Sequence, residues 1–160
     1  MIILGLDPGS TRVGYGFIRK EGQQLSFLNA GLLSITSTDP HRRLVELEAS
    51  LFTLLRATTP HVVAIEKLFF MRNMKTAVAV SQSRGVLLLT LAKQKLPVLE
   101  YSPLEIKQGI TGYGMASKKS VATVVAKILR IPPLHVHDDV TDALAAAILA
   151  SMRSRMNTQE

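Results

Sequence analysis

The segment that most constrains the fold is a long apolar stretch near the C-terminus, introduced by acidic residues. Residues 143–149 read Ala-Leu-Ala-Ala-Ala-Ile-Leu, and Asp138, Asp139 and Asp142 precede them. This pattern predicts a buried helix from about Asp138 to Ser154. Residues three or four apart share one helix face, so Asp142 can lie beside either Asp139 or Asp138. Because acids are almost never fully buried without a partner, these carboxylates need a compensating group.

Two more carboxylates stand where apolar, strand-like runs end. Asp7 follows the run 2–6, and Glu66 follows the run 62–65. Ligands of open α/β sheets gather at the carboxyl ends of strands, so these side chains are expected at one edge. Taken singly, each acid is more typical of a turn, a helix cap or an ion pair.

A site for divalent cations is predicted by four of these acids together: Asp7, Glu66, Asp142 and either Asp139 or Asp138. Close carboxylates raise one another's pKa and cannot all stay ionised without compensation. Oxygen ligands without sulfur favour Mg²⁺ or Mn²⁺ over zinc. Two such ions would hold the attacking water and the leaving oxygen of a phosphodiester displacement.

The remaining pattern predicts an α/β fold. Three early strands followed by strands that alternate with helices favour a five-stranded mixed sheet with helices on both faces. Asp39-Pro40 and the Ser102…Glu105 spacing are helix-start signals. We expect strands over 1–6, 13–18, 24–35, 62–66 and 98–101, and helices over about 40–59, 74–95, 103 onward and 117–129. The helix over 74–95 is expected to be largely buried, within one domain over 1–156 and before a disordered tail over 157–160.

Composition favours a cytoplasmic protein that meets a polyanion. The chain has 19 Lys and Arg against 12 Asp and Glu, a net charge of +7. Such an excess commonly marks a nucleic-acid partner, although solubility alone is the plainer explanation. The absence of cysteine excludes a disulfide framework and a thiolate zinc site. Asp7 interrupts the first apolar run, which argues against a secretory signal, and no apolar stretch approaches the roughly 20 residues of a membrane span.

Aromatic and basic residues after Glu66 are candidates for contact with nucleic acid. Phe69 and Phe70 stand beside Arg72 and Lys75, and an aromatic among basic residues can stack on a base or wedge between bases. Packing in the core is the plainer role for either ring. We expect Phe69 to be exposed and Phe70 to be buried.

Lysines at two later helices could contact phosphates. Lys107 lies on the helix after Ser102, and Lys118 and Lys119 open the next one. A solvated charged face is the usual alternative. His135 and His137 are more typical of a loop, although His137 could act near a metal through its pKa close to neutrality.

The turn over residues 7–14 suggests an alternative class of protein. Its glycines and hydroxyls suit contact with a phosphate, but they are equally typical of a tight hairpin. The turn looks like the first phosphate loop of actin-like ATPases and sugar kinases, which close two domains around ATP. This chain has room for about one domain, and it offers no second phosphate loop.

Several short motifs occur together along the chain: residues 3–10 with 14–16, 64–66 followed by Phe69 and Asn73, 84–86, 100–101, 106–108, 112–114 before Lys118, and 139–144. In this combination the chain resembles the RuvC-type Holliday-junction resolvases of bacteria over essentially its whole length. The resemblance implies an RNase-H-like fold, a homodimer, and metal-dependent nicking of two opposing strands of a four-way DNA junction. It also implies a role in homologous recombination and DNA repair alongside the RuvA and RuvB proteins.

The resemblance further assigns roles to individual residues. It implies Asp7, Glu66, Asp139 and Asp142 as catalytic metal ligands, because 139–144 matches the family pattern Asp-x-x-Asp-Ala-Leu and so favours Asp139 over Asp138. Phe69 would lie near the crossover, and Lys107 and Lys118 would contact DNA. The expected cofactor is Mg²⁺, two ions per site, with Mn²⁺ as a substitute, and the expected nick has 5′-phosphate and 3′-hydroxyl ends.

The chain departs from the family pattern at two positions. A second aromatic residue, Phe70, follows Phe69, and Lys67 directly follows Glu66.

A third hypothesis is a junction-binding protein without catalytic activity. The presence of all four acids disfavours it.

Overall fold

A five-stranded mixed sheet organises the structure, a computed structural model that describes residues 1–68, 74–133 and 137–153. The strands are β1 (Ile2–Pro8), β2 (Val13–Glu21), β3 (Gln24–Leu32), β4 (Val62–Glu66) and β5 (Val98–Tyr101), in the order β3-β2-β1-β4-β5. The first three form an antiparallel meander, and β4 and β5 continue the sheet in parallel from β1. The predicted mixed sheet is therefore confirmed.

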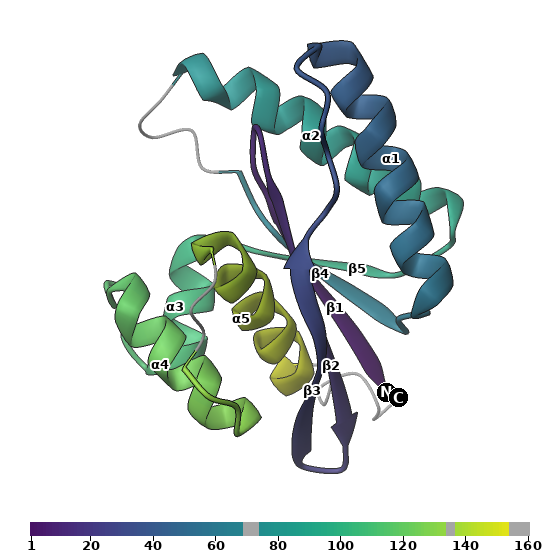
Figure 1. Cartoon of the computed structure of the whole chain (residues 1–160). Helices are drawn as coiled ribbons and strands as arrows, with labels where there is room; N and C mark the ends of the chain where they lie inside the picture. The colour runs from purple at the N-terminus through teal and green to yellow at the C-terminus, as the bar shows by residue number, and fades with distance from the viewer. Residues whose placement is uncertain (69–73, 134–136, 154–160) are drawn as a thin grey trace.

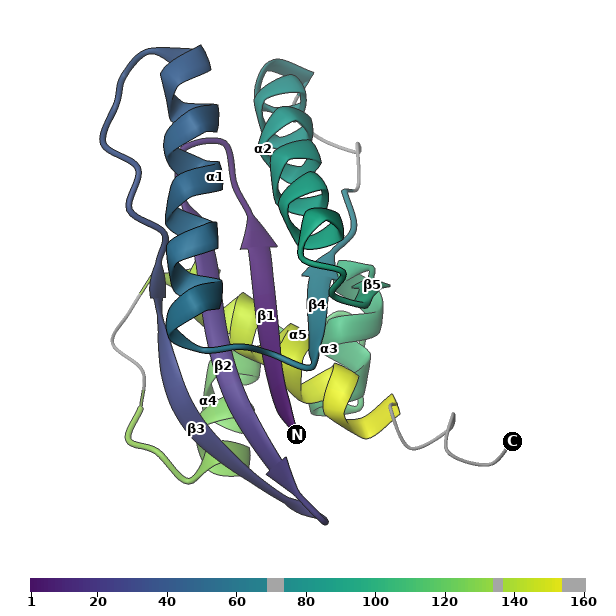
Figure 2. The same ribbon diagram turned by 90° about the vertical axis from the view of Figure 1, so that its right-hand side faces the viewer.

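Helices cover both faces of this sheet, as the sequence predicts (Figures 1 and 2). On one face lie α1 (Pro40–Ala57) and α2 (Met74–Lys93). On the other lie α3 (Pro103–Thr111), α4 (Lys118–Leu129) and α5 (Asp138–Arg153). Each face has its own cluster of buried apolar side chains, so the sheet separates two cores.

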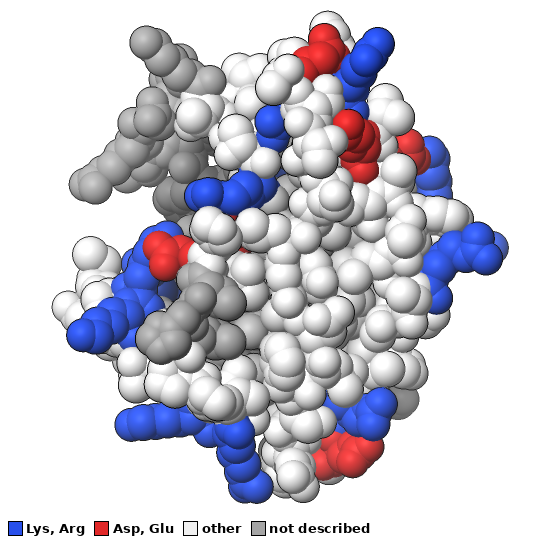
Figure 3. All heavy atoms as spheres, viewed as in Figure 1, with Lys and Arg blue, Asp and Glu red and all other residues white. Residues whose placement is uncertain are grey.

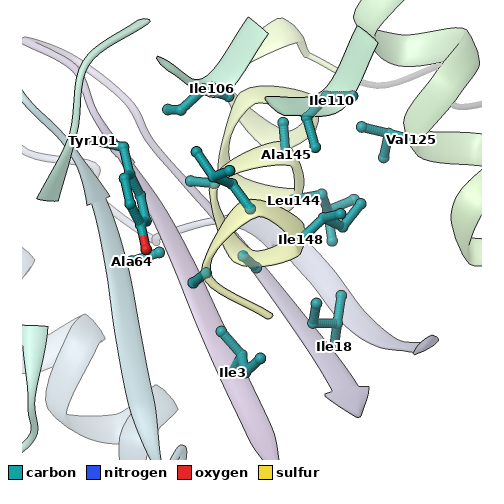
Figure 4. Packing of buried hydrophobic residues seen from close by; sticks show 14 of the residues in the cluster. Ile3, Ile18, Ala64, Tyr101, Ile106, Ile110, Val125, Leu144, Ala145 and Ile148 are labelled. Carbon is teal, nitrogen blue, oxygen red and sulfur yellow. The ribbon is translucent and has the colours of Figure 1, made fainter. Parts of the chain in front are cut away.

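The helix α5 is the centre of one core (Figure 4). Its residues 143–150 are at most 3% exposed, which confirms the predicted buried helix. Glycines on the strands let this helix approach closely. A Cβ built on Gly5 would lie 1.8 Å from the carbonyl oxygen of Ala143, and one on Gly14 would lie 2.0 Å from that of Asp139. The first turns of α5 are thus held against the carboxyl end of β1.

The helix starts follow the local signals in the sequence. The side chain of Asp39 accepts from Arg42 N–H at 2.8 Å, and Ser102 forms a complete capping box with Glu105. Ser117 caps α4 through Ser120 N–H. Each cap satisfies backbone donors that the helix itself leaves unpaired.

The expectation that the helix over 74–95 is largely buried is wrong. It ends at Lys93, and its side chains Val78 and Leu89 are 64% and 56% exposed. Apolar residues lie around most of the helix, so Leu87 and Leu91 are buried whereas Val78 and Leu89 are not. The third strand also ends earlier than expected, at Leu32. In the described part of the chain, no helix is long and apolar enough to cross a bilayer.

Candidate functional site

The four acids line one pocket of about 340 Å³. Its described lining also contains Pro8, Pro103, Ile106, Lys107, Lys118 and Val121. Leu6 of β1 pairs with Ile65 of β4, so the next residues, Asp7 and Glu66, stand at the same level of neighbouring parallel strands. Their side chains leave the sheet at its carboxyl edge, which is the ligand-binding edge of such sheets.

The other two acids come from the first turns of α5. Asp139 and Asp142 lie one turn apart, and the side chain of each is 26% exposed. Asp138, the first residue of the helix, has a 66% exposed side chain and is not part of the described lining. The structure thus brings Asp139 into the pocket and leaves Asp138 at its rim, a choice that helical spacing alone left open.

Burial and like charge perturb these carboxyl groups. Burial is the main cause that raises the pKa of Asp7 well above its usual value, and the charges of Glu66, Asp142 and Asp139 add to it. Burial, followed by the charge of Asp142, raises the pKa of Glu66 to about 7. Burial likewise raises the pKa of Asp142, against the attraction of Lys118. The pocket therefore favours a proton or a cation among its carboxylates.

Two basic side chains supply part of that compensation. Lys118 Nζ lies 3.2 Å from an oxygen of Asp138 and 3.6 Å from one of Asp142. Arg12 Nε donates to Asp139 at 3.2 Å. The region where α4 and α5 begin carries adjoining acidic and basic side chains, at the left of the view in Figure 3. Both cations are more than half exposed, so these pairs add little to stability.

The donor set fits a hard divalent cation, although the side chains are not arranged around one. Among the described residues, no three acidic or histidine side chains converge as ready ligands. Two of the pocket carboxylates instead pair with Arg12 and Lys118. The oxygen-only chemistry of the four acids and the raised pKa values of Asp7 and Glu66 both suit Mg²⁺ or Mn²⁺.

The remaining predicted residues divide into three groups. Lys107 and Lys118 line the pocket, whereas Lys119 is exposed on the first turn of α4. His137 is exposed, and its carbonyl accepts from Val140 N–H. The described residues do not include Phe69, Phe70, Arg72, His135, the side chain of Lys75 or the predicted tail over 157–160.

Sequence reasoning missed one residue that contacts the site. Arg12 stands in the opening turn, where the sequence suggested a phosphate contact or a tight hairpin. Its partner, Asp139, is 127 residues away, so no local pattern could identify the pair. The only available signal was a basic residue five positions after Asp7.

Comparison with known proteins finds one family over nearly the whole chain. A family model described as crossover junction endodeoxyribonuclease RuvC matches residues 3–150. A protein of that name from Natranaerobius thermophilus is 41% identical over 160 residues, which is 99% of each chain. Another, from Thermomicrobium roseum, is 44% identical over 156 residues, 97% of this chain and 95% of that one.

Solved structures show the same similarity. The Thermus thermophilus RuvC structure is 30% identical, with a TM-score of 0.88 over 99% of this chain and 98% of that one. A second structure of that protein, in complex with a Holliday junction substrate, gives a TM-score of 0.90 over 99% and 97%. The fowlpox virus resolvase, 16% identical with a TM-score of 0.63 over 96% and 99%, shares the fold.

Proposed function

The chain belongs to the RuvC family of crossover junction endodeoxyribonucleases, and on that premise we propose that it resolves Holliday junctions through the carboxylate pocket. The observation that carries this proposal is that Asp7, Glu66, Asp139 and Asp142 all line one pocket at the carboxyl edge of the sheet. The family does not favour the rival readings of an ATP-dependent phosphotransferase or a non-catalytic binding protein.

Within the pocket, we assign the four acids as metal ligands. Asp7 lies at the centre of the electrostatic conflict, since the charges of all three other acids raise its pKa. The charged form of Asp7 would therefore be stabilised most by a bound cation, which Glu66 and the acids of α5 would help to hold. Two Mg²⁺ ions, or Mn²⁺ as a substitute, would activate water and neutralise charge on the phosphate. The resulting nick would leave 5′-phosphate and 3′-hydroxyl ends.

The basic residues of the pocket would hold the DNA. Lys107 and Lys118 face the same pocket as the acids, so a backbone phosphate that enters can contact both. Lys118 pairs with Asp142 across 3.6 Å, and the arrival of cations and phosphate would let it exchange the carboxylate for the phosphate. Phe69, Arg72, Lys75 and Lys119 remain candidates for contacts with the junction arms.

Cleavage of two opposing strands requires two such sites. A homodimer with two-fold symmetry would supply one site for each strand. The exposed Val78 and Leu89 on α2 support an interface on that helix. We further place the enzyme in the cytoplasm, alongside RuvA and RuvB.

The proposal is tested by conservative substitution of the acids. Asp7→Asn and Asp139→Asn should bind a four-way junction as the wild type does but lose at least about 100-fold in nicking rate in Mg²⁺, since each removes a metal ligand. Gel-shift and single-turnover assays with Mg²⁺, Mn²⁺ or Ca²⁺ measure the two properties separately. Asp138→Asn is the matched control, because its carboxylate lies outside the described pocket lining. Wild-type cleavage by Asp7→Asn in Mg²⁺ would overturn the assignment.

A further inference from the structure

The loop that joins α3 to α4 presents apolar side chains to solvent beside the pocket. Tyr113 is 64% exposed, Met115 is 73% exposed, and Leu104 of α3 is 55% exposed. A Cβ on Gly114 would lie 2.9 Å from Leu104 Cδ1, so the loop backbone packs on that leucine. Tyr113 and Met115 flank Gly114 in the chain, and we call these two residues and Leu104 the loop patch.

Hydrogen bonds fix the loop at both ends. Gly112 takes a left-handed conformation, with φ of 77°, and its N–H donates to Gln108 O at 2.8 Å. Tyr113 N–H donates to Thr111 Oγ1 at 3.1 Å, and Ala116 N–H donates to Tyr113 O at 3.1 Å. Ala116 is itself buried. The exposure of the patch is therefore built into the backbone, and presenting it costs little further ordering entropy.

The loop patch is close in the chain to residues that line the carboxylate pocket. Both helices that the loop joins contribute to the pocket, α3 through Lys107 and α4 through Lys118. Met115 is three residues from Lys118, which limits the separation of their Cα atoms to about 11 Å. A partner whose backbone enters the pocket would thus bring its neighbouring groups onto the patch.

The charged residues on the flanking helices indicate which class of molecule would bind the patch. Lys107, Lys118 and Lys119 lie on the two helices that flank it, and Lys118 also pairs with Asp138 and Asp142. The acid of this segment, Glu105, is engaged by Ser102 and Arg153. A partner that offers anionic groups to the lysines and flat apolar groups to the patch is a nucleic acid. Aromatic side chains stack on bases, and methionine can wedge between base steps.

We propose that Tyr113 and Met115 contact the DNA bases next to the phosphate held in the pocket, and so determine where and in which sequence the strand is cut. This inference rests on the proposed function. The lysines neutralise phosphates of any sequence, whereas the patch touches the bases themselves. Its contribution should therefore be larger for the choice of cut site than for overall affinity.

The test uses the full-length protein and the double variant Tyr113→Ala/Met115→Ala. On a panel of junctions that differ in sequence at the crossover, we expect the ratio of rates between the best and worst sequences to fall about 10-fold. Fluorescence of 2-aminopurine beside the cut should rise when wild type binds, since the base unstacks from its neighbours, and should rise less with the double variant. Tyr113→Phe keeps the ring and should restore both signals.

Val45→Ala is the matched control, because Val45 is 68% exposed on α1, on the other face of the sheet. It should leave sequence preference and fluorescence unchanged. A double variant with wild-type preference and fluorescence would overturn the inference. So would a double variant altered only in the presence of a partner protein, because the patch would then be a protein-docking surface. If wild type itself fails to nick junctions, the proposed function has failed instead.

Discussion

The helices on the two faces of the sheet meet it in different ways. On one face, α5 approaches so closely that a Cβ on Gly5 would lie 1.8 Å from a helix carbonyl oxygen. On the other, α2 packs on α1 and leaves Val78 and Leu89 more than half exposed. The closely packed face carries Asp139 and Asp142, whereas the loosely covered face contributes no acid to the described pocket lining.

This difference separates two physical tasks. Ligands of a metal site must be positioned within fractions of an ångström, and direct backbone packing provides that precision. A helix with exposed apolar side chains can associate with another surface, which would then bury those side chains. The same sheet therefore supports a rigid site on one face and a candidate interface on the other.

The largest effect should come from adding a side chain where β1 and α5 approach each other most closely. Gly5→Val places atoms on the backbone of α5, where no side chain can move aside, and should cost about 3 kcal/mol or more in the free energy of unfolding. Urea denaturation measures this loss. Gly85→Ala on α2 is the control for the other face, since a Cβ added there would meet no atom within 4 Å. It should stabilise the protein by about 0.5 to 1 kcal/mol, and equal destabilisation by both variants would contradict the comparison.

A smaller effect should come from the charge of Glu66. Its pKa is raised from 4.5 to about 7, so the folded state binds a proton more tightly than the unfolded chain. The free energy of unfolding of metal-free protein should therefore fall as the pH rises from about 4.5 through 7, by up to about 3 kcal/mol from this group, and then level off. Mg²⁺ should restore stability at pH 8.

Glu66→Gln removes that titration and should flatten much of the decline, although Asp7 has a raised pKa and retains a part of it. Glu48→Gln is the matched control on the other face, where Glu48 pairs with Lys93 at 2.7 Å. Denaturation between pH 5 and 8 measures each slope. A decline in Glu66→Gln as steep as in the wild type would contradict the electrostatic account.

The smallest effect on folding should come from the exposed side of α2. Leu89→Lys replaces a side chain that is 56% exposed, so the unfolding free energy of the monomer should change by less than about 0.5 kcal/mol. The same change should abolish the proposed dimer, because it places a charge in an apolar interface. Analytical ultracentrifugation tests this expectation, with Val45→Lys as the control. A dimeric Leu89→Lys would exclude this part of α2 from the interface.

Local signals in the sequence were sufficient for most elements. The capping box of Ser102 and Glu105 and the cap at Asp39 involve residues three apart, and both are present in the structure. The apolar run after Asp142 likewise predicts a buried helix, and α5 confirms it. The extent of burial on α2 was predicted wrongly, because apolar composition does not tell which side of a helix its neighbours cover.

By itself the sequence determined which residue types were available: four acids at the ends of apolar elements, in a chain whose net charge is +7. Helical spacing left Asp138 and Asp139 open, and only the family resemblance favoured Asp139. The tertiary structure decided that Asp139 lines the pocket while Asp138 does not, and it alone shows that Arg12 pairs with an acid 127 residues away. The physical reason is that helical spacing permits both aspartates, whereas the close packing of α5 on Gly14 fixes the rotation of the helix against the sheet.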